Sequence, residues 1–302
     1  MSNLRRLAAY AAILAACAAP PTQPPSPTEP VALTPAILVQ AGEPGLETLT
    51  VIDLRSGAST SIEGPAGGIH LLAPGWASRY AVAQAGPSVA LGSPAGDAAV
   101  AWEIIDLGTA APGVVVGSAV SPDGSRLVAA LAAADPRRPY DVVTVEIGSR
   151  RTSAVRVAAE LDGIPTWVDD HRVAIPTIGP GHVRVLTIVD VDDGSQGTRP
   201  TELADLTRSA DGARFATATA IYGPTIFELA NPSAAVIAHT GVVDNHGSVA
   251  LDRNGGRLAV VLEDEDGDAI AVGVYSEAIG WNEEARFAIP GGAKRAVVTW
   301  LR

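Results

Sequence analysis

The chain has 302 residues and a net charge of −12, with 33 Asp and Glu residues against 21 Lys and Arg residues. This acidic balance, without a basic cluster beyond the N-terminus, excludes nucleic acid and anionic lipid headgroups as expected partners of its surface. Hydrophobic residues make up 47% of the chain and aromatic residues only 4%, which predicts a sizeable aliphatic core and few aromatic faces for stacking on sugars or bases.

The N-terminal residues have the pattern of an export signal. Arg5 and Arg6 give a basic start, and the ten-residue apolar run that follows is too short to span a bilayer as a helix. The sequence Leu-Ala-Ala-Cys at 14–17 resembles the bacterial lipobox, in which the thiol is acylated and the preceding segment is removed. We therefore predict a lipoprotein signal peptide over 1–16 and a lipid anchor, such as palmitate, on Cys17.

Cys17 is the only cysteine, which excludes an intramolecular disulfide and any multi-cysteine metal site. The alternative interpretation of this residue is an incidental small side chain at the end of the signal peptide. Acyl chains contribute about 0.8 kcal/mol per buried methylene, so a multiply acylated terminus holds to a membrane surface without spanning it. Residues 18–35 contain seven prolines and no apolar periodicity, which predicts an extended tether. The predicted domains are thus the signal peptide, a lipidated tether over 17–35 and one folded domain over 36–302.

A repeated plan runs through the folded part. Each copy has a polar turn, a basic residue and then an apolar strand, and the aligned arginines are 47, 46, 42 and 43 residues apart. This interval is typical of four-stranded propeller blades. Runs rich in Val, Ile and Thr, at 140–148, 182–191 and 269–276, favour strands between the turns. The copies lie at 73–83, 120–131, 166–177, 208–219 and 251–262, and their arginines are Arg79, Arg126, Arg172, Arg214 and Arg257.

The turns of this repeat contain residues that suit tight backbone conformations. Pro122 presets φ at the second position of its turn, and Asp123 and Gly124 tolerate the later positions. The sequence Ser-Ala-Asp-Gly at 209–212 repeats this arrangement without proline, and the Asn-Gly pair at 254–255 is a strong hairpin signal. The same type of turn is therefore expected in successive repeats.

The pattern Ser-Pro-Asp-Gly-x-Arg followed by apolar residues, with Trp167 just before one turn, resembles the WD-like repeat of the TolB-type propeller family. The resemblance covers most of the folded part and is clearest at 119–131 and 206–219. It implies an all-β propeller with four-stranded antiparallel blades. The Ala-rich segment 83–101 of the second repeat departs from the pattern.

The two ends of the folded part complement each other. Residues 36–64 predict three strands of a blade that lacks its first, innermost strand. The C-terminal segment 295–302 has the character of that strand, with Trp300 placed like Trp167. A ring of sheets needs its last blade joined to its first if free strand edges are to be avoided. We therefore predict a six-bladed β-propeller whose first blade is closed by the C-terminal strand.

No constellation of residues predicts catalysis. The five histidines are assigned to different repeats without a paired metal-binding spacing, and the chain has no G-x-S-x-G nucleophile elbow. Turn or loop positions are therefore favoured for them over catalytic roles. We predict no catalytic, cofactor-binding or metal-binding residue, no cofactor and no enzyme activity. The histidines are His70, His171, His182, His239 and His246.

Two acidic turns could offer oxygen ligands to Ca²⁺. The run at 263–268 does not follow the EF-hand pattern, and the other turn is a short acidic segment before Gly194. A solvated hairpin turn is favoured over a metal site at both places. The residues concerned are Asp264, Asp266 and Asp268 in the first turn and Asp190, Asp192 and Asp193 in the second.

Three tryptophans could form an aromatic set near the centre of the ring. Packing into the wedge-shaped gaps between blades is favoured over a ligand-facing role. They are Trp76, Trp167 and Trp300.

These features favour a membrane-anchored, extracytoplasmic propeller lipoprotein that binds or scaffolds an envelope protein or peptide. Its expected location is the outer face of the cell membrane or the outer membrane, where the lipid on Cys17 provides the membrane contact. One alternative is a propeller-type small-ligand binder or lactonase-like metal-dependent hydrolase, which requires a bound divalent ion. Another is a purely structural or sensory domain.

Overall fold

The computed structural model describes residues 35–42, 47–66, 68–69, 71–72, 80–83, 86–94, 100–133, 139–200, 206–209, 214–217, 225–228, 235–239, 246–252, 254–262, 269–276, 280–289 and 296–301. All of them fall within one compact unit that spans residues 34–302. Within this described part, no helix is long and apolar enough to cross a membrane. Cys17 and residues 18–34 of the predicted tether lie outside it.

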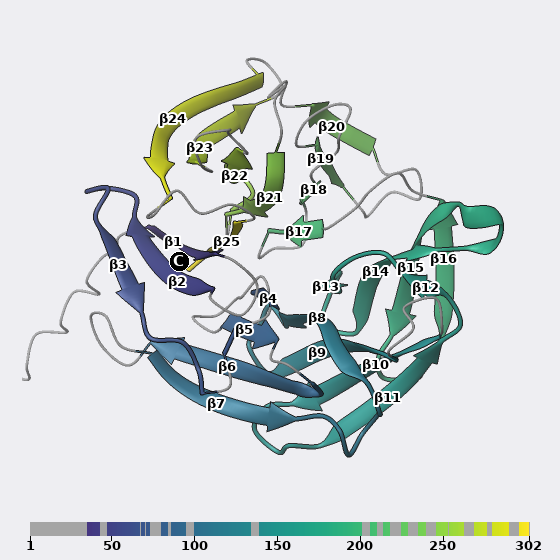
Figure 1. Cartoon of the computed structure of the whole chain (residues 1–302). Helices are drawn as coiled ribbons and strands as arrows, with labels where there is room; N and C mark the ends of the chain where they lie inside the picture. The colour runs from purple at the N-terminus through teal and green to yellow at the C-terminus, as the bar shows by residue number, and fades with distance from the viewer. Residues whose placement is uncertain are drawn as a thin grey trace, which may run out of the picture. The chain divides into compact units, whose positions relative to one another are not determined.

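The described residues form strands and one short 3₁₀ helix, η1 (Pro180–His182), which confirms the predicted all-β fold. The strands build six antiparallel sheets, numbered here in chain order (Figure 1). Sheet 1 contains β25 (Val297–Trp300), β1 (Ala36–Ala41), β2 (Thr48–Asp53) and β3 (Ser59–Ile62). Sheet 2 contains β4 (Leu71–Leu72), β5 (Tyr80–Ala83), β6 (Ser88–Pro94) and β7 (Val100–Asp106). Sheet 3 contains β8 (Val114–Val120), β9 (Arg126–Ala132), β10 (Tyr140–Glu146) and β11 (Thr152–Val157).

The other three sheets follow the same order along the chain. Sheet 4 contains β12 (Glu160–Leu161), β13 (Thr166–Trp167), β14 (Arg172–Ile178), β15 (Arg184–Asp190) and β16 (Gln196–Pro200). Sheet 5 contains β17 (Leu206–Arg208), β18 (Phe215–Thr217), β19 (Thr225–Glu228) and β20 (Ala235–His239). Sheet 6 contains β21 (His246–Leu251), β22 (Arg257–Leu262), β23 (Ala269–Ser276) and β24 (Gly280–Ala288). In Figure 1 the first strands, such as β8, β13 and β17, lie towards the middle, and the fourth strands, such as β7, β11 and β16, lie outside.

Sheet 4 differs from the predicted four strands because its first strand is split into β12 and β13. Both pieces pair with β14, on either side of the segment 162–165. Pro165 has no N–H to donate and Gly163 weakens extended structure, so this segment interrupts the ladder.

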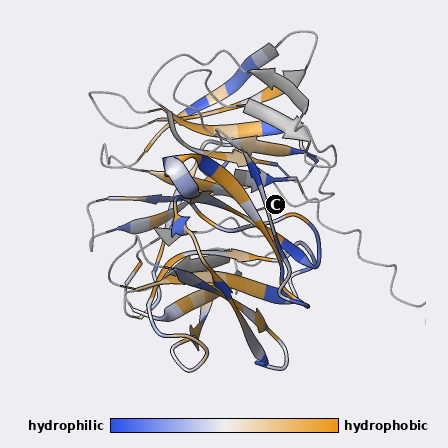
Figure 2. Ribbon diagram, turned by 90° about the vertical axis from the view of Figure 1, so that its right-hand side faces the viewer, coloured by the Kyte–Doolittle hydropathy of each residue, from blue (hydrophilic) through white to orange (hydrophobic). Residues whose placement is uncertain are grey.

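Middle strands are buried on both of their faces. Nearly every residue of β9 and β10 is buried, whereas most residues of the fourth strand β11 are exposed. A strand packed between two neighbouring sheets needs apolar residues on both sides, which explains the continuous apolar run of β9. Figure 2 shows hydrophobic residues along such strands and hydrophilic residues at the strand ends and turns. Charged side chains of the described residues lie at the turns and also along exposed fourth strands such as β11 and β24.

Apolar clusters join each sheet to the next. Among the described residues there are six such clusters, and one of them connects sheet 6 with sheet 1. Each buried methylene contributes roughly 0.8 kcal/mol, so these clusters are the main favourable term for packing the sheets together. Pairs that represent the six clusters in chain order are Leu49 and Ala90, Leu91 and Leu131, Val142 and Ile175, Leu186 and Phe215, Ala216 and Leu258, and Ile270 and Ile37.

The C-terminal strand completes the first sheet, as the sequence predicted. β25 pairs antiparallel with β1, in a register that places Trp300 opposite Ile37 and Val297 opposite Gln40. The Leu301 N–H also donates to the Ala36 carbonyl at 2.9 Å. The backbone groups at the inner edge of β1 are thereby paired by a segment from the far end of the chain.

Two tryptophans bind the first strand of one sheet to the first strand of the preceding sheet. Trp167 Nε1 donates to the Ala119 carbonyl at 3.1 Å, and Trp300 Nε1 donates to the Ala250 carbonyl at 2.9 Å. Both side chains are almost fully buried. The predicted packing role between sheets is confirmed for these two, and Trp76 lies outside the described residues.

Deletion of residues 296–301 should abolish cooperative unfolding, because it uncovers the edge of β1 and removes part of the cluster between sheets 6 and 1. A circularly permuted chain should keep it if residues 296–301 precede 35–289 through a Ser-Pro-Asp-Gly-Ser turn, since β25 can then still pair with β1. Circular dichroism during chemical denaturation measures both variants. A deletion variant that unfolds at the same denaturant concentration as the parent would contradict the pairing.

Replacing Trp167 with Phe should lower the free energy of unfolding by about 1–3 kcal/mol, because the buried Ala119 carbonyl loses its donor. Trp102→Phe is the matched control, since Trp102 Nε1 donates to the Glu63 carbonyl at an exposed position. The control should change stability by about 0.5 kcal/mol or less. Urea titration checks both, and equal losses in the two variants would argue against a special role of the buried bond.

Candidate functional site

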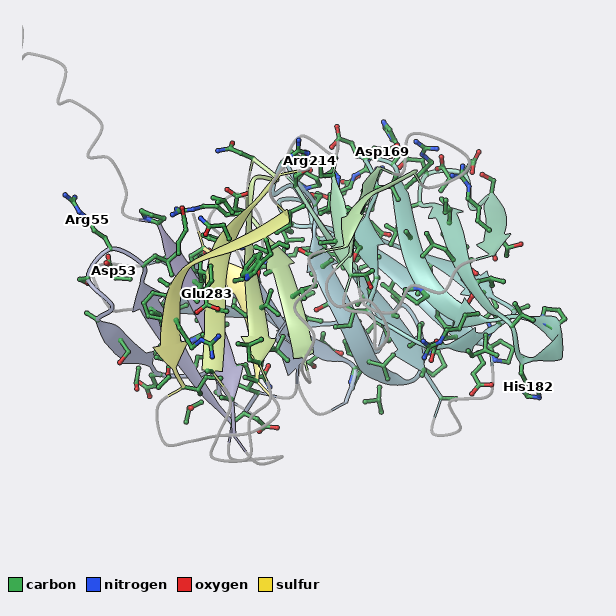
Figure 3. All side chains as sticks on the ribbon, turned by 90° about the horizontal axis from the view of Figure 1, so that it is seen from above. Asp53, Arg55, Asp169, His182, Arg214 and Glu283 are labelled. Atoms are coloured by element: carbon green, nitrogen blue, oxygen red, sulfur yellow. The ribbon has the colours of Figure 1, made fainter. Side chains whose placement is uncertain are left out.

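The turns between first and second strands, and between third and fourth strands, lie on one face of the folded unit, called here the turn face. Figure 3 shows Asp169 and Arg214, from turns of two different sheets, towards one side of the molecule and His182 towards the opposite side. His182 belongs to the loop between β14 and β15, which connects a second strand with a third. The charged side chains of the repeated motif therefore share the turn face.

The turn of sheet 3 shows why the motif folds locally. Asp123 accepts hydrogen bonds from the Ser121 hydroxyl at 2.6 Å, from the Ser125 hydroxyl at 2.6 Å and from the Ser125 N–H at 3.0 Å. Gly124 takes a positive φ of 73°, which a residue without Cβ adopts without strain. Although partial burial opposes ionisation, the two serine hydroxyls hold the pKa of Asp123 below its usual value. The aspartate of the motif thus works as a turn-closing acceptor.

At four copies of the motif, the described residues on either side of the turn share one backbone bond. In each, the carbonyl of the motif arginine accepts an N–H from the residue that begins the turn, as the repeat predicted. The pairs are Ser121 N with Arg126 O at 2.8 Å, Val168 N with Arg172 O at 2.7 Å, Ser209 N with Arg214 O at 2.9 Å, and Asp252 N with Arg257 O at 2.9 Å.

Two of the motif arginines also reach the turn of the next sheet. Arg126 Nη1 donates to the Asp170 carbonyl at 3.3 Å, and Arg214 Nη1 donates to the Gly255 carbonyl at 2.7 Å. Gly255 has a φ of 67°, and a Cβ there would lie 2.9 Å from Arg214 Cδ. The Asn-Gly turn predicted at 254–255 is therefore also the place where the arginine of sheet 5 packs.

Asp192 links three turns. Its Oδ1 accepts from Arg126 Nη1 at 2.9 Å, and its Oδ2 lies 2.5 Å from His171 Nδ1. This hydrogen bond and the carboxylate charge raise the pKa of His171, and the same bond together with Arg126 lowers the pKa of Asp192. The contact ties the motif arginine of sheet 3 to two turns of sheet 4.

The other two aspartates of this acidic turn accept hydrogen bonds from backbone N–H groups. Asp190 Oδ1 accepts the Asp192 N–H at 2.9 Å, and Asp193 Oδ1 accepts the Ser195 N–H at 2.7 Å. Gly194 has a φ of 75°, as a tight turn requires. This geometry supports the hairpin interpretation over the metal interpretation.

A cleft of about 340 Å³ lies at the turn face between sheets 3 and 4. Glu146 stands opposite Arg126 in the register of β9 and β10, pairs with Arg151 and accepts the Ser149 hydroxyl at 2.8 Å. Polar groups from two sheets therefore meet around one hollow. The cleft is lined by Arg126, Thr144, Glu146, Arg151, Thr152, Ser153, Val191 and Asp192.

The sequence identified two of these lining residues, Arg126 and Asp192, as members of a repeat and an acidic turn. It gave no signal for Glu146 and Arg151, which occupy an ordinary hairpin turn. Only the strand register brings Glu146 beside Arg126. Glu146 and Arg151 carry opposite charges on the two sides of one hairpin turn. This is the one sequence feature that could have drawn attention to these two residues.

The histidine prediction is partly wrong. His171 and His182 belong to the same sheet and flank the two ends of β14, whereas the repeat had placed all five histidines in different units. The short strand Arg172–Ile178 explains this, since only seven residues separate its two turns. Both residues occupy turns, as expected. The expected turn or loop position is wrong for His239 and His246, which lie at the end of β20 and at the start of β21. His70 lies outside the described residues.

Several other predicted residues also fall outside the part of the chain that the structure describes. They are Cys17, Trp76, Arg79, Asp211 with Gly212, and Asp264, Asp266 and Asp268. Within the described part, no group of three or more His, Cys, Asp or Glu side chains is placed to hold a metal ion.

No protein-family model matches the sequence, and no curated protein matches it either. Solved structures do match the fold. TolB from Acinetobacter baumannii has a TM-score of 0.59 and 15% identity over 88% of this chain, which spans 66% of that TolB chain. The β-propeller domain of Cps50 (Swd1) from Myceliophteria thermophila has a TM-score of 0.55 and 14% identity, with 87% of this chain and 86% of that chain covered.

The fold is a β-propeller. A chain of a nidogen/laminin complex matches as well, with a TM-score of 0.60, 11% identity, and 88% of this chain and 98% of that chain covered. At these identities the likeness establishes the fold alone, because propellers with unrelated functions share one architecture. The resemblance to the TolB-type propeller that the turn motif suggested is supported at the level of the fold.

Asp192→Asn should lower the pKa of His171, because the hydrogen-bonded carboxylate is what raises it. The pair stabilises the fold fully below the unfolded-state pKa of 6.5, and this contribution disappears as the pH rises through the higher folded-state pKa. An NMR titration of the imidazole measures the change. Asp193→Asn is the control, because that carboxylate binds the Ser195 N–H instead. An unchanged midpoint in the Asp192 variant would refute the assignment.

Proposed function

We propose that this chain is an extracytoplasmic β-propeller lipoprotein that binds another envelope protein or peptide and has no enzymatic activity of its own. The observation that carries the proposal is the turn face, where side chains from adjacent sheets fix one another's positions. Arg126 and Arg214 each hold the turn of the following sheet. A rigid, charged face of this kind suits recognition of a protein surface, because little side-chain freedom remains to be lost on binding.

We further infer that the six sheets are the six blades of one ring. The apolar clusters join successive sheets, and one cluster also joins the last sheet, sheet 6, to the first sheet, sheet 1. The pairing of β25 with β1 supports the same inference, since the first blade then contains both ends of the folded domain.

The use of the acidic side chains also supports a binding role. In the described turns, Asp123, Asp169 and Asp193 accept hydrogen bonds from neighbouring serine or backbone groups. Their carboxylates are thus engaged in shaping the turns. One of the similar solved chains comes from a complex of two proteins, nidogen and laminin, which is consistent with a protein-binding use of the fold.

The basic start, the short apolar run and the lipobox-like sequence before Cys17 support export and lipid anchoring. Cys17→Ser should abolish incorporation of labelled palmitate and move the protein from the membrane fraction to the soluble envelope fraction. Sedimentation after cell fractionation measures this. The control is Ser26→Ala, a change within the tether that leaves the thiol intact. Continued membrane sedimentation of the Cys17 variant would overturn the anchor.

The partner is tested by crosslinking in cells, followed by purification of the tagged chain and identification of its neighbours. Specific recovery of one envelope protein is the expected result. Recovery of nothing above background from a folded chain would refute the binding role. Stoichiometric calcium in the purified protein, with stability lost on chelation, would instead favour the metal-dependent hydrolase.

A further inference from the structure

We propose that the cleft between sheets 3 and 4 binds a carboxylate group presented by a segment of the partner protein, with Arg126 and Arg151 as the donors. This inference rests on the proposed protein-binding function and assigns it a place on the turn face. It is carried by the hydrogen-bonding capacity that remains in the cleft after all contacts within the protein have been made.

The two guanidinium groups have donors to spare. Each arginine offers five N–H groups. Arg151 uses Nη2 for Glu146, and Arg126 uses Nη1 for Asp192 and for the Asp170 carbonyl. Within the described residues, the Nε and the second Nη of both side chains have no protein acceptor.

The carboxylate oxygens of the cleft, in contrast, each have a hydrogen-bond partner already. Glu146 Oε1 pairs with Arg151 and its Oε2 accepts the Ser149 hydroxyl. Asp192 receives Arg126 on one oxygen and His171 on the other. Each of these four carboxylate oxygens already accepts a hydrogen bond, whereas several guanidinium N–H groups still lack an acceptor, so an anionic ligand would add bonds to the arginines. A carboxylate matches the planar fork of a guanidinium and can bind it through two parallel hydrogen bonds.

The position of the cleft strengthens such a bond. Thr144 and Val191, which line it, are almost fully buried, and the Arg126 side chain is only 24% exposed. Charges in a partly sheltered site interact more strongly than on an open surface. Arg151 is 78% exposed and stands at the rim, where it can meet an incoming group. The hydroxyls of Thr152 and Ser153 line the same hollow.

The charge of the whole chain limits the partner segment. A net charge of −12 repels strongly acidic proteins at long range. Within a Debye length of about 8 Å at physiological salt, the charges that line the cleft matter most, and there the two arginines balance Glu146 and Asp192. We therefore expect a segment with one or two carboxylates, such as an isolated Glu side chain or a C-terminus, and not a long acidic run.

The test uses blocked peptides as probes, one with the sequence Gly-Gly-Glu-Gly-Gly and one with Gln in place of Glu. Arginine Nε–H signals in NMR spectra report binding at each side chain. The expected result is that the Glu peptide shifts the Arg126 and Arg151 signals while the Gln peptide does not. Binding should weaken about tenfold in Arg151→Gln, because one charge-assisted bond pair is lost. Equal binding of the two peptides would overturn the proposal.

The control variant is Arg55→Gln, an exposed arginine in a turn of sheet 1 on the same face. It changes the net charge by the same amount and should leave peptide binding unchanged. A similar loss in this control would show that only the overall charge matters and would refute the site. Because Arg151 is largely exposed, its replacement should leave the fold intact, and denaturation of each variant checks this. Tight binding of inorganic phosphate without binding of the Glu peptide would also overturn the assignment to a carboxylate.

Crosslinking in cells separates this site from the general function. If the parent chain recovers a partner and Arg151→Gln recovers it much less, both proposals are supported. If the variant recovers the partner equally well, the cleft is not the docking site but the binding function stands. If neither chain recovers a partner, the protein-binding function fails, whereas the peptide titration still decides the chemistry of the cleft.

Discussion

The packing of each sheet against its neighbours is the constraint on which the rest of this structure depends. A four-stranded sheet with two apolar faces is unstable alone, and here apolar clusters join each sheet to the one before it and to the one after it. The N-terminal part of the folded domain supplies only three strands of sheet 1, namely β1, β2 and β3. The fourth strand of this sheet must therefore come from elsewhere in the chain. The pairing of β25 with β1 supplies that strand and makes the two ends of the folded domain depend on each other.

Hydrogen bonds between adjacent sheets fix how the sheets are oriented relative to each other. Apolar packing holds the sheets together but has no preferred direction. Side-chain hydroxyls of inner strands take part, since Thr207 accepts the Leu251 N–H and Ser248 accepts the Val298 N–H across adjacent sheets. Trp167 and Trp300 bind equivalent carbonyls in their preceding sheets. Such bonds supply the edges of inner strands with partners that a strand ladder cannot provide. They also explain why residues from separate sheets can act together at the turn face.

In the proposed binding role, the turn face combines structural and recognition chemistry in the same residues. Arg126 closes a local turn with its backbone, holds the next turn with one nitrogen and still has donors that face the cleft. The carboxylates nearby are already bonded, so the chemistry of the hollow is set by what remains on the arginines. The proposed site depends on the repeat in part, because Arg126 and Arg214 reach the turn of the following sheet, whereas Arg172 and Arg257 pair with Asp169 and Glu284 of their own sheets.

The sequence alone determined the all-β class, the spacing of the turns, the strand-forming segments and the complementary ends of the domain. These are local or periodic properties, and β-branched runs, Asp-Gly turns and the 42–47-residue interval report them directly. Only the tertiary structure decided the splitting of the first strand of sheet 4, the placement of His171 and His182 in one sheet, and the meeting of Arg126, Glu146 and Asp192. Those outcomes depend on strand register and on contacts between residues as many as 66 positions apart, and no local pattern encodes such contacts.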